Sequence, residues 1–290
     1  MNLAPFLRKP ISEDLSAQPA LEEERPFDWA IFHVPHDSTD IPADVRDQIA
    51  LDDEQLGNEL LKMTDHFTAR LFCSDSNSQN IVRAPVSRLV VDVERFVEDS
   101  AEPMAEKGMG VIYTQTSDGR PLRRQISPGE RQLLLERYYI PHHRRLEQRV
   151  DEKLGVYGKC LVLDCHSFPS VALPYEGSEQ GTPRPDICIG TNGFHTPAEL
   201  AEGLLKEFSA LGFRVALNDP FSGALVPMSR YQKDNRVHAV MIEINRNLYM
   251  DEAAGEPNER ISELGRVVRT TILKCLKNMN ESMPVSKLDN

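Results

Sequence analysis

The sequence predicts an α/β fold with three layers, in which helices cover both faces of a mixed β-sheet. Several short segments are apolar at consecutive positions, as in residues 160–163 and 239–242. Such runs are typical of strands that are covered on both faces. Longer segments with a helical repeat of apolar residues lie between these runs, and this alternation indicates an α/β arrangement.

Seven short apolar segments are the expected strands. They comprise residues 29–34, 80–83, 88–93, 160–165, 187–190, 213–217 and 239–244.

Four longer segments are the expected helices, at residues 53–73, 128–154, 197–211 and 256–279. The first carries an apolar stripe at helical spacing. The second begins with Ser127 as N-cap, Pro128 at the first helical position and Glu130 three residues after the cap, which is a capping-box pattern. The third begins in the same way at Thr196.

Length and composition favour one large domain, because no linker divides the 290 residues. Residues 1–26 are rich in Pro and Glu and are expected to form an extended arm. Residues 27–280 are expected to form the single domain, and residues 281–290 a C-terminal tail.

The formal net charge of −12 repels phosphate backbones and argues against a nucleic-acid partner. No apolar run approaches the ~18 residues of a membrane span, and the N-terminal residues lack the pattern of a secretory signal. The five cysteines are odd in number and form no CxxC, as expected for buried thiols in a reducing compartment. We therefore expect a cytoplasmic protein, as a monomer or small homo-oligomer.

Positive charge is concentrated between residues 117 and 150, where eight arginines occur. Two interpretations remain open: an ordinary solvated helix face, or a local positive field for a small anionic substrate.

Polar side chains follow several of the expected strands, where an open α/β sheet binds its ligands. His36 follows the first strand, Arg95 follows residues 88–93, His166 follows residues 160–165, and Glu243 lies in the last strand. Because these residues come from distant segments, their convergence is the main functional signal.

Two imidazoles and a carboxylate would leave one position open on a tetrahedral Zn²⁺ ion, the pattern of a hydrolytic site. His36, His166 and a carboxylate are the expected ligands. Glu243 is the expected general base, which takes a proton from water and passes it to the leaving nitrogen. Arginines would pair with substrate carboxylates, since a planar guanidinium matches a planar carboxylate.

Competing motifs are absent from the sequence: it contains no HExxH, Walker A, GxSxG or GxGxxG pattern. Cys165 and His166 are adjacent on a strand and point to opposite faces, which argues against a thiol nucleophile. His33 is expected to be a core histidine, and His66 and His142 structural or surface groups.

Six short blocks resemble the N-formylglutamate amidohydrolase family and follow one another in the family's order between about residues 29 and 252. They are a Pro-His block (34–42), a Thr-Asp block (64–72), a Ser-Arg…Asp…Arg block (87–95), a Tyr-x-Pro block (139–143), an Asp-x-His-Ser block (164–167) and a closing block (238–243 with 248–251).

The resemblance implies a fold similar to zinc carboxypeptidases and aspartoacylase-like enzymes, within the phosphorylase/hydrolase-like class. It implies hydrolysis of a small anionic N-acyl amino acid, N-formyl-L-glutamate to formate and L-glutamate, in histidine degradation. It also favours Asp65 as the third metal ligand, with Asp40 as the fallback.

Five further residues fall in or beside family blocks and are the expected substrate-binding residues: Arg95, His143, Arg246, Asn218 and Gly223.

The chain departs from the family pattern at four places: Asp37-Ser38 after the Pro-His, His66 in place of an aromatic residue, His142 in place of the Tyr of the Tyr-x-Pro-Tyr-His block, and residues 101–124. Two alternatives therefore remain: a carboxypeptidase- or aspartoacylase-like hydrolase with another N-acyl substrate, or a non-catalytic carboxylate-binding relative.

Overall fold

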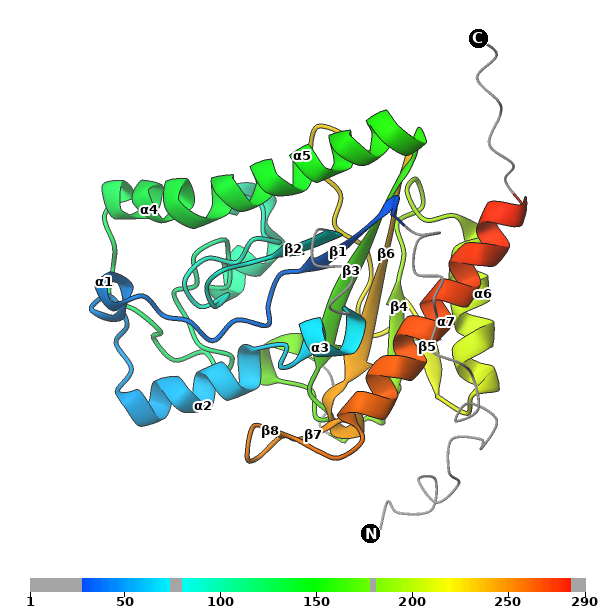
Figure 1. Ribbon diagram of the computed structural model, residues 1–290. Helices are drawn as coiled ribbons and strands as arrows, with labels where there is room; N and C mark the ends of the chain where they lie inside the picture. Colours follow the sequence, from blue (N-terminus) through cyan, green and yellow to red (C-terminus); the bar gives the residue numbers. More distant parts are fainter. Residues whose placement is uncertain (1–27, 74–79, 178–180, 283–290) are drawn as a thin grey trace.

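The computed structural model describes residues 28–73, 80–177 and 181–282 (Figure 1). The expected N-terminal arm and most of the expected C-terminal tail lie outside these residues. The division into arm, domain and tail therefore stays a prediction. No helix in the described part of the chain is both long enough and apolar enough to cross a membrane.

A six-stranded sheet forms the centre of the molecule, with strand order β2-β1-β3-β6-β4-β5. The strands are β1 (Ala30–Val34), β2 (Ile81–Arg83), β3 (Cys160–Phe168), β4 (Ile187–Gly190), β5 (Val215–Leu217) and β6 (Val237–Asn245). β4 runs antiparallel to β6, whereas the other neighbouring strands are parallel, so the sheet is mixed as predicted. A two-stranded sheet of β7 (Met250–Asp251) and β8 (Glu256–Pro257) lies beside it.

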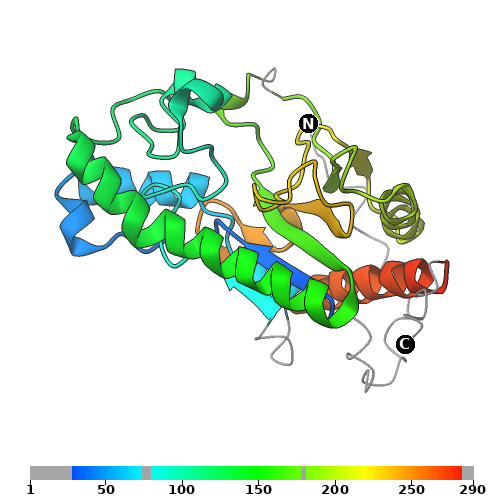
Figure 2. The ribbon, with the colours of Figure 1, turned by 90° about the horizontal axis from the view of Figure 1, so that it is seen from above.

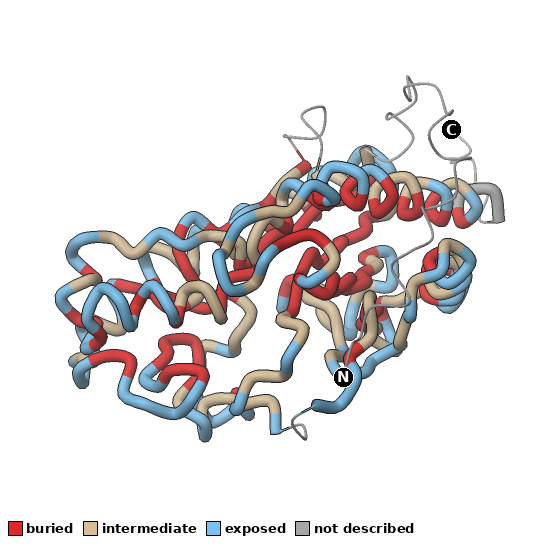
Figure 3. The backbone as a smooth tube through the Cα atoms, turned by 90° about the horizontal axis from the view of Figure 1, so that it is seen from below, coloured by how far each residue is buried: buried red, intermediate tan, exposed pale blue. Residues whose placement is uncertain are grey.

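Helices cover both faces of the sheet and confirm the three layers (Figures 1 and 2). One face carries α3 (Thr68–Phe72), α6 (Ala198–Ala210) and α7 (Ile261–Ser282), and the other carries α5 (Ile140–Tyr157). Side chains of β3 alternate between the two cores, with Leu161 and Leu163 facing α7 and Val162 facing α5. Figure 3 shows that the buried segments run through the middle of the molecule.

The expected helix at residues 53–73 is two helices, α2 (Asp53–Met63) and α3. α2 ends at Met63, the next residue Thr64 is extended, and Phe67 adopts a left-handed backbone conformation with φ 63°. The apolar stripe continues through this break, which is why the sequence pattern does not reveal it. The break places Asp65 beside β1, where its N–H donates to the carbonyl of His36 at 2.9 Å.

The expected strand at residues 88–93 is wrong: this segment forms turns outside the sheet. Its apolar residues are nevertheless buried, with Val90 and Val91 packing near α4 (Pro128–Leu134) and Leu89 in a separate cluster beneath α2. A run of β-branched residues therefore reflects burial here and not strand pairing.

The remaining helix boundaries differ in detail. The capping box of Ser127 and Glu130 is confirmed, and a π-helical turn (Leu135–Tyr139) joins α4 to α5. α6 starts after Pro197 without a side-chain cap, α7 starts only at Ile261, and a short α1 (Ala43–Arg46) follows β1.

Candidate active site

The structure brings His36, His166 and Glu243 together beside the sheet. His36 lies just beyond β1, and the His36 and His166 ring centroids are 5.2 Å apart. His166 on β3 and Glu243 on β6 are register partners in the parallel pair. The expected convergence of these three residues is therefore present in the fold.

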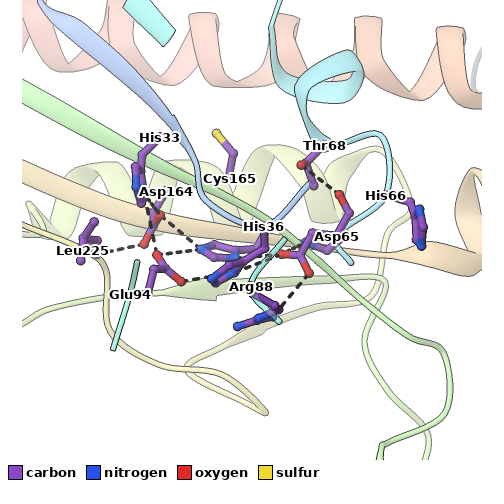
Figure 4. A network of polar contacts seen from close by, with 12 residues as sticks. His33, His36, Asp65, His66, Thr68, Arg88, Glu94, Asp164, Cys165 and Leu225 are labelled. Carbon is purple, nitrogen blue, oxygen red and sulfur yellow. Dashed lines mark hydrogen bonds and ion pairs between the residues drawn. The ribbon is translucent and has the colours of Figure 1, made fainter. Parts of the chain in front are cut away.

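Carboxylates lie close to both histidines, and Figure 4 shows Glu94 and Asp65 on either side of His36. Asp65 Oδ2 lies 3.0 Å from His166 Nδ1 and 3.8 Å from His36 Nδ1. Glu94 lies on another side, with Oε1 3.2 Å from His166 Nε2 and Oε2 3.6 Å from His36 Nδ1. Two acidic side chains thus lie within reach of both imidazoles.

The imidazole of His36 has one partnered and one unpartnered nitrogen. Nε2 lies 2.8 Å from Asp92 Oδ1, while Nδ1 is buried and has no hydrogen-bond partner. A carboxylate on one imidazole nitrogen fixes the ring and leaves the other nitrogen to bind a metal. An unpartnered buried nitrogen is costly, so this arrangement fits a ligand nitrogen.

The charged side chains around His166 and Asp65 create an electrostatic field that favours positive charge there. Burial lowers the pKa of His166, but Glu94 and Asp164 outweigh it and hold that pKa well above its usual value. Burial also opposes the ionisation of Asp65, but hydrogen bonds and the charges of His166 and His36 hold its pKa well below normal. The same field would stabilise a divalent cation.

Two groups of side chains in the described residues have ligand atoms close enough to hold a metal ion. One is His36, Glu94 and His166, and the other is His33, Glu94 and Asp164; within each group the atoms lie within 4.8 Å of one another. The first group fits a metal better. In the second group, His33 Nδ1 and Asp164 Oδ1 are already hydrogen-bonded to each other at 2.7 Å.

Glu243 lies next to this cluster without a clear partner. It is 7% exposed, and its Oε2 atom is buried without a hydrogen bond. Burial raises the pKa of Glu243 to about 8. A carboxylate with a raised pKa is a stronger base, which suits proton transfer near neutral pH.

A cavity of about 590 Å³ opens beside these residues and is lined by Asp65, Glu94, His166 and Glu243, among others. Cationic side chains also line it, including Arg88 and Arg95. This combination of a polar centre and flanking cations suits a small anionic ligand.

The expected substrate-binding residues are only partly brought to the cavity. Arg95, His143 and Gly223 line it, and the buried Nε of Arg95 has no hydrogen-bond partner. His143 Nε2 donates to the carbonyl of Val93 at 2.8 Å. Asn218 does not line the cavity: its amide bonds Thr191 near the end of β4.

Arg246 borders the cavity but is bound to the protein through all three guanidinium nitrogens. Nη2 donates to Asp65 Oδ1 at 3.1 Å and to the carbonyl of Ser167 at 3.2 Å. Nη1 donates to the carbonyl of Lys62 at 2.6 Å, and Nε to Ser167 Oγ at 3.3 Å. The guanidinium therefore holds Asp65 in place.

The fallback ligand Asp40 is exposed and does not line the cavity. Glu94, in contrast, was not identified as a site residue from the sequence. It directly precedes Arg95 in the sequence. Its place in the same family block, residues 87–95, is the feature that could have identified it.

Asp164 and His33 also belong to the site. Asp164 Oδ1 lies 3.2 Å from His166 Nε2 and 2.7 Å from His33 Nδ1, and the second nitrogen of His33 is 2.8 Å from His142 Nε2. Asp164 precedes His166 by two residues, so both side chains lie on one face of β3. That spacing could have identified it.

Comparisons with known proteins identify the family of this chain. The profile of the N-formylglutamate amidohydrolase family matches residues 29–250. The chain is 30% identical over 224 residues to the N-formylglutamate deformylase of Pseudomonas aeruginosa, covering 74% of this chain and 81% of that protein. It is 29% identical to the N-formylglutamate deformylase of Pseudomonas putida, covering 68% of this chain and 74% of that protein.

Solved structures show the same fold. The N-formylglutamate amidohydrolase from Ralstonia eutropha JMP134 superposes with a TM-score of 0.75 at 22% identity, covering 88% of this chain and 95% of that one. A gene product from Agrobacterium tumefaciens gives a TM-score of 0.63 at 20% identity, covering 87% and 92%. The sequence match over most of the chain and the shared fold together show that this chain belongs to the N-formylglutamate amidohydrolase family.

Proposed function

We propose that this chain hydrolyses the amide bond of N-acylated acidic amino acids, with N-formyl-L-glutamate giving formate and L-glutamate. The observation that carries the proposal is the meeting of two buried histidines with the unpartnered carboxylate of Glu243 at one cavity. The names of the Pseudomonas relatives supply the formylglutamate substrate.

His36, Asp65 and His166 would hold one Zn²⁺ ion, and Glu94 offers a further carboxylate. When bound, zinc lowers the pKa of a water molecule to about 7 and polarises a carbonyl group. The orphaned Nδ1 of His36 and the field that favours positive charge support this assignment.

The other site residues have roles that follow from their contacts. Glu243 accepts the proton of the attacking water and returns it to the leaving nitrogen. Arg95, whose Nε makes no hydrogen bond and lies 3.6 Å from Asp92 Oδ2, binds the substrate carboxylates. Arg88 lines the cavity and donates to Asp92 through Nε and Nη2, so it adds positive charge at this wall. His143 and Gly223 form part of the cavity wall. Asn218 lies outside the cavity and holds the loop that follows β5 through its hydrogen bond with Thr191.

We further propose that the protein acts in the cytoplasm, in histidine degradation. All five cysteines are free thiols, and four of them are buried, as expected in a reducing compartment.

The direct test is to purify the protein, measure its metal content, and assay glutamate release from N-formyl-L-glutamate. We expect about one zinc per chain and turnover that a chelator abolishes and added Zn²⁺ restores. A protein that binds the substrate without releasing glutamate, even with Zn²⁺ present, would instead be a non-catalytic carboxylate-binding relative.

A further inference from the structure

The cavity has chemically different walls on the two sides of His166. His166 Nδ1 faces Asp65, whose Oδ1 lies 3.8 Å from Arg88 Nη1. His166 Nε2 faces Asp164, whose Oδ2 accepts a hydrogen bond from the N–H of Leu225 at 2.9 Å. In Figure 4, Leu225 lies beside Asp164 and Arg88 lies below Asp65, so the two residues are on different sides of His36.

The wall beyond Asp164 is mainly apolar. The segment between β5 and β6 lines it with Phe221, Ala224, Leu225, Val226, Met228 and Tyr231, which we call the apolar wall, and also with Pro220, Ser222 and Gly223. Met228 is 56% exposed, although it is a large apolar side chain. Exposed apolar side chains gathered at a cavity often mark a binding surface.

One residue of the apolar wall, Phe221, is held in position by its neighbours. The rings of Phe221 and Phe168 are 5.6 Å apart, and the guanidinium of Arg184 lies 4.7 Å from Phe168 and 5.3 Å from Phe221. Arg184 is itself buried and paired with Glu176 at 2.8 Å. An aromatic ring fixed in this way can help to select a ligand by shape, because this ring needs little ordering when the ligand binds.

The orientation of a substrate follows from these two walls. Its carboxylates belong near Arg88 and Arg95, its scissile amide near His166 and Glu243, and its acyl group against the apolar wall. A formyl group contributes one carbon and cannot cover that wall, and a cavity of about 590 Å³ is within the size range of drug-sized ligand sites.

We propose that the apolar wall is an acyl subsite, and that this chain cleaves N-acyl acidic amino acids with an unbranched acyl chain of medium length, such as hexanoyl, better than the formyl compound. This inference rests on the proposed function. In the reaction, water adds its oxygen to the acyl carbon, the carbon–nitrogen bond breaks, and the proton passes to the nitrogen. The products from N-hexanoyl-L-glutamate are hexanoate and L-glutamate.

The test compares kcat/KM for the N-formyl, N-acetyl, N-butanoyl and N-hexanoyl derivatives of L-glutamate with the zinc-loaded protein. Each methylene that the wall covers should raise kcat/KM by up to about fourfold. If formylglutamate is cleaved and activity falls with each added methylene, the acyl subsite is wrong and the proposed function stands. If no derivative is cleaved, the proposed function itself fails.

A variant locates the subsite. Ala224→Leu places a larger side chain in the apolar wall, and we expect the ratio of hexanoyl to formyl kcat/KM to fall at least tenfold. Ser229→Leu makes a comparable change on an exposed residue of the same segment that does not line the cavity, so it should leave this ratio unchanged. If Ala224→Leu does not fold, Phe221→Leu, which removes part of the aromatic wall, should also lower the ratio. An unchanged ratio in a folded wall variant would overturn the assignment.

Discussion

Replacement of Arg246 by Met separates two roles for this arginine, an anchor for Asp65 and a clamp for substrate carboxylates. Met has a similar length but cannot donate any of the four hydrogen bonds that Arg246 makes to Asp65, Ser167 and Lys62. Both Arg246 and Asp65 are almost fully buried, at 3% and 2% exposure. The variant therefore removes from a buried carboxylate the arginine that is hydrogen-bonded to it, and leaves His166 at 3.0 Å and Arg88 at 3.8 Å among its remaining cationic neighbours.

The expected magnitude follows from that burial. Removing one partner of a buried ion pair costs about 3–5 kcal/mol, because the other charge remains in a medium of low dielectric constant. Asp65 keeps its contact with His166 at 3.0 Å, so the folded state should survive with reduced stability. Arg246 is a hydrogen-bond partner of Asp65, the proposed metal ligand, and loss of such a partner lowers metal affinity by about 10–100-fold.

Two assays measure these effects: urea unfolding of the metal-free protein, and zinc affinity by competition with a chromophoric chelator. Arg246→Lys is the matched control, since it keeps the charge and can donate to Asp65, and it should lose less of both quantities. If Arg246→Met binds zinc as tightly as the parent and only raises KM for acidic substrates, the anchor role is refuted and the clamp role is supported.

Three further substitutions test other parts of the site. Glu243→Gln should keep zinc binding while lowering kcat by about 10³-fold or more, as expected when a general base is lost, and an active variant would exclude this role. Arg95→Ala should raise KM for acidic N-acyl amino acids by roughly 10–100-fold and leave neutral ones almost unaffected, measured by amine release with both classes. Glu94→Gln should weaken zinc binding in a chelator competition by about tenfold, whereas the exposed control Asp40→Asn should not; equal affinities would remove Glu94 from the metal site.

Most of the sheet could be predicted from the sequence, because buried strands carry continuous apolar runs. The segment at residues 88–93 shows the limit of this reasoning. Its Leu and Val residues are as buried as those of β3, yet they pack under helices without joining the sheet. An apolar composition indicates that a segment is buried, whereas strand pairing depends on contacts with distant segments.

The candidate site was predictable where it depended on strand ends. His36, His166 and Glu243 follow from that rule and from the family blocks. The second layer of contacts was not predictable, since Arg246 could bind either a substrate or Asp65, and only the fold shows that Lys62, Asp65 and Ser167 already occupy its nitrogens. The break between α2 and α3 was hidden for a similar reason, because Phe67 and its neighbours keep the apolar spacing of a continuous helix.

The most direct test of the central claim is the anomalous diffraction of a crystal of the zinc-loaded protein, recorded on both sides of the zinc absorption edge. The account predicts one strong peak within bonding distance of His36 Nδ1 and the imidazole of His166, next to the carboxylates of Asp65 and Glu94, with Glu243 nearby and not bonded. A peak bound by other residues, or no peak after loading, would contradict the claim that these side chains form a metal centre.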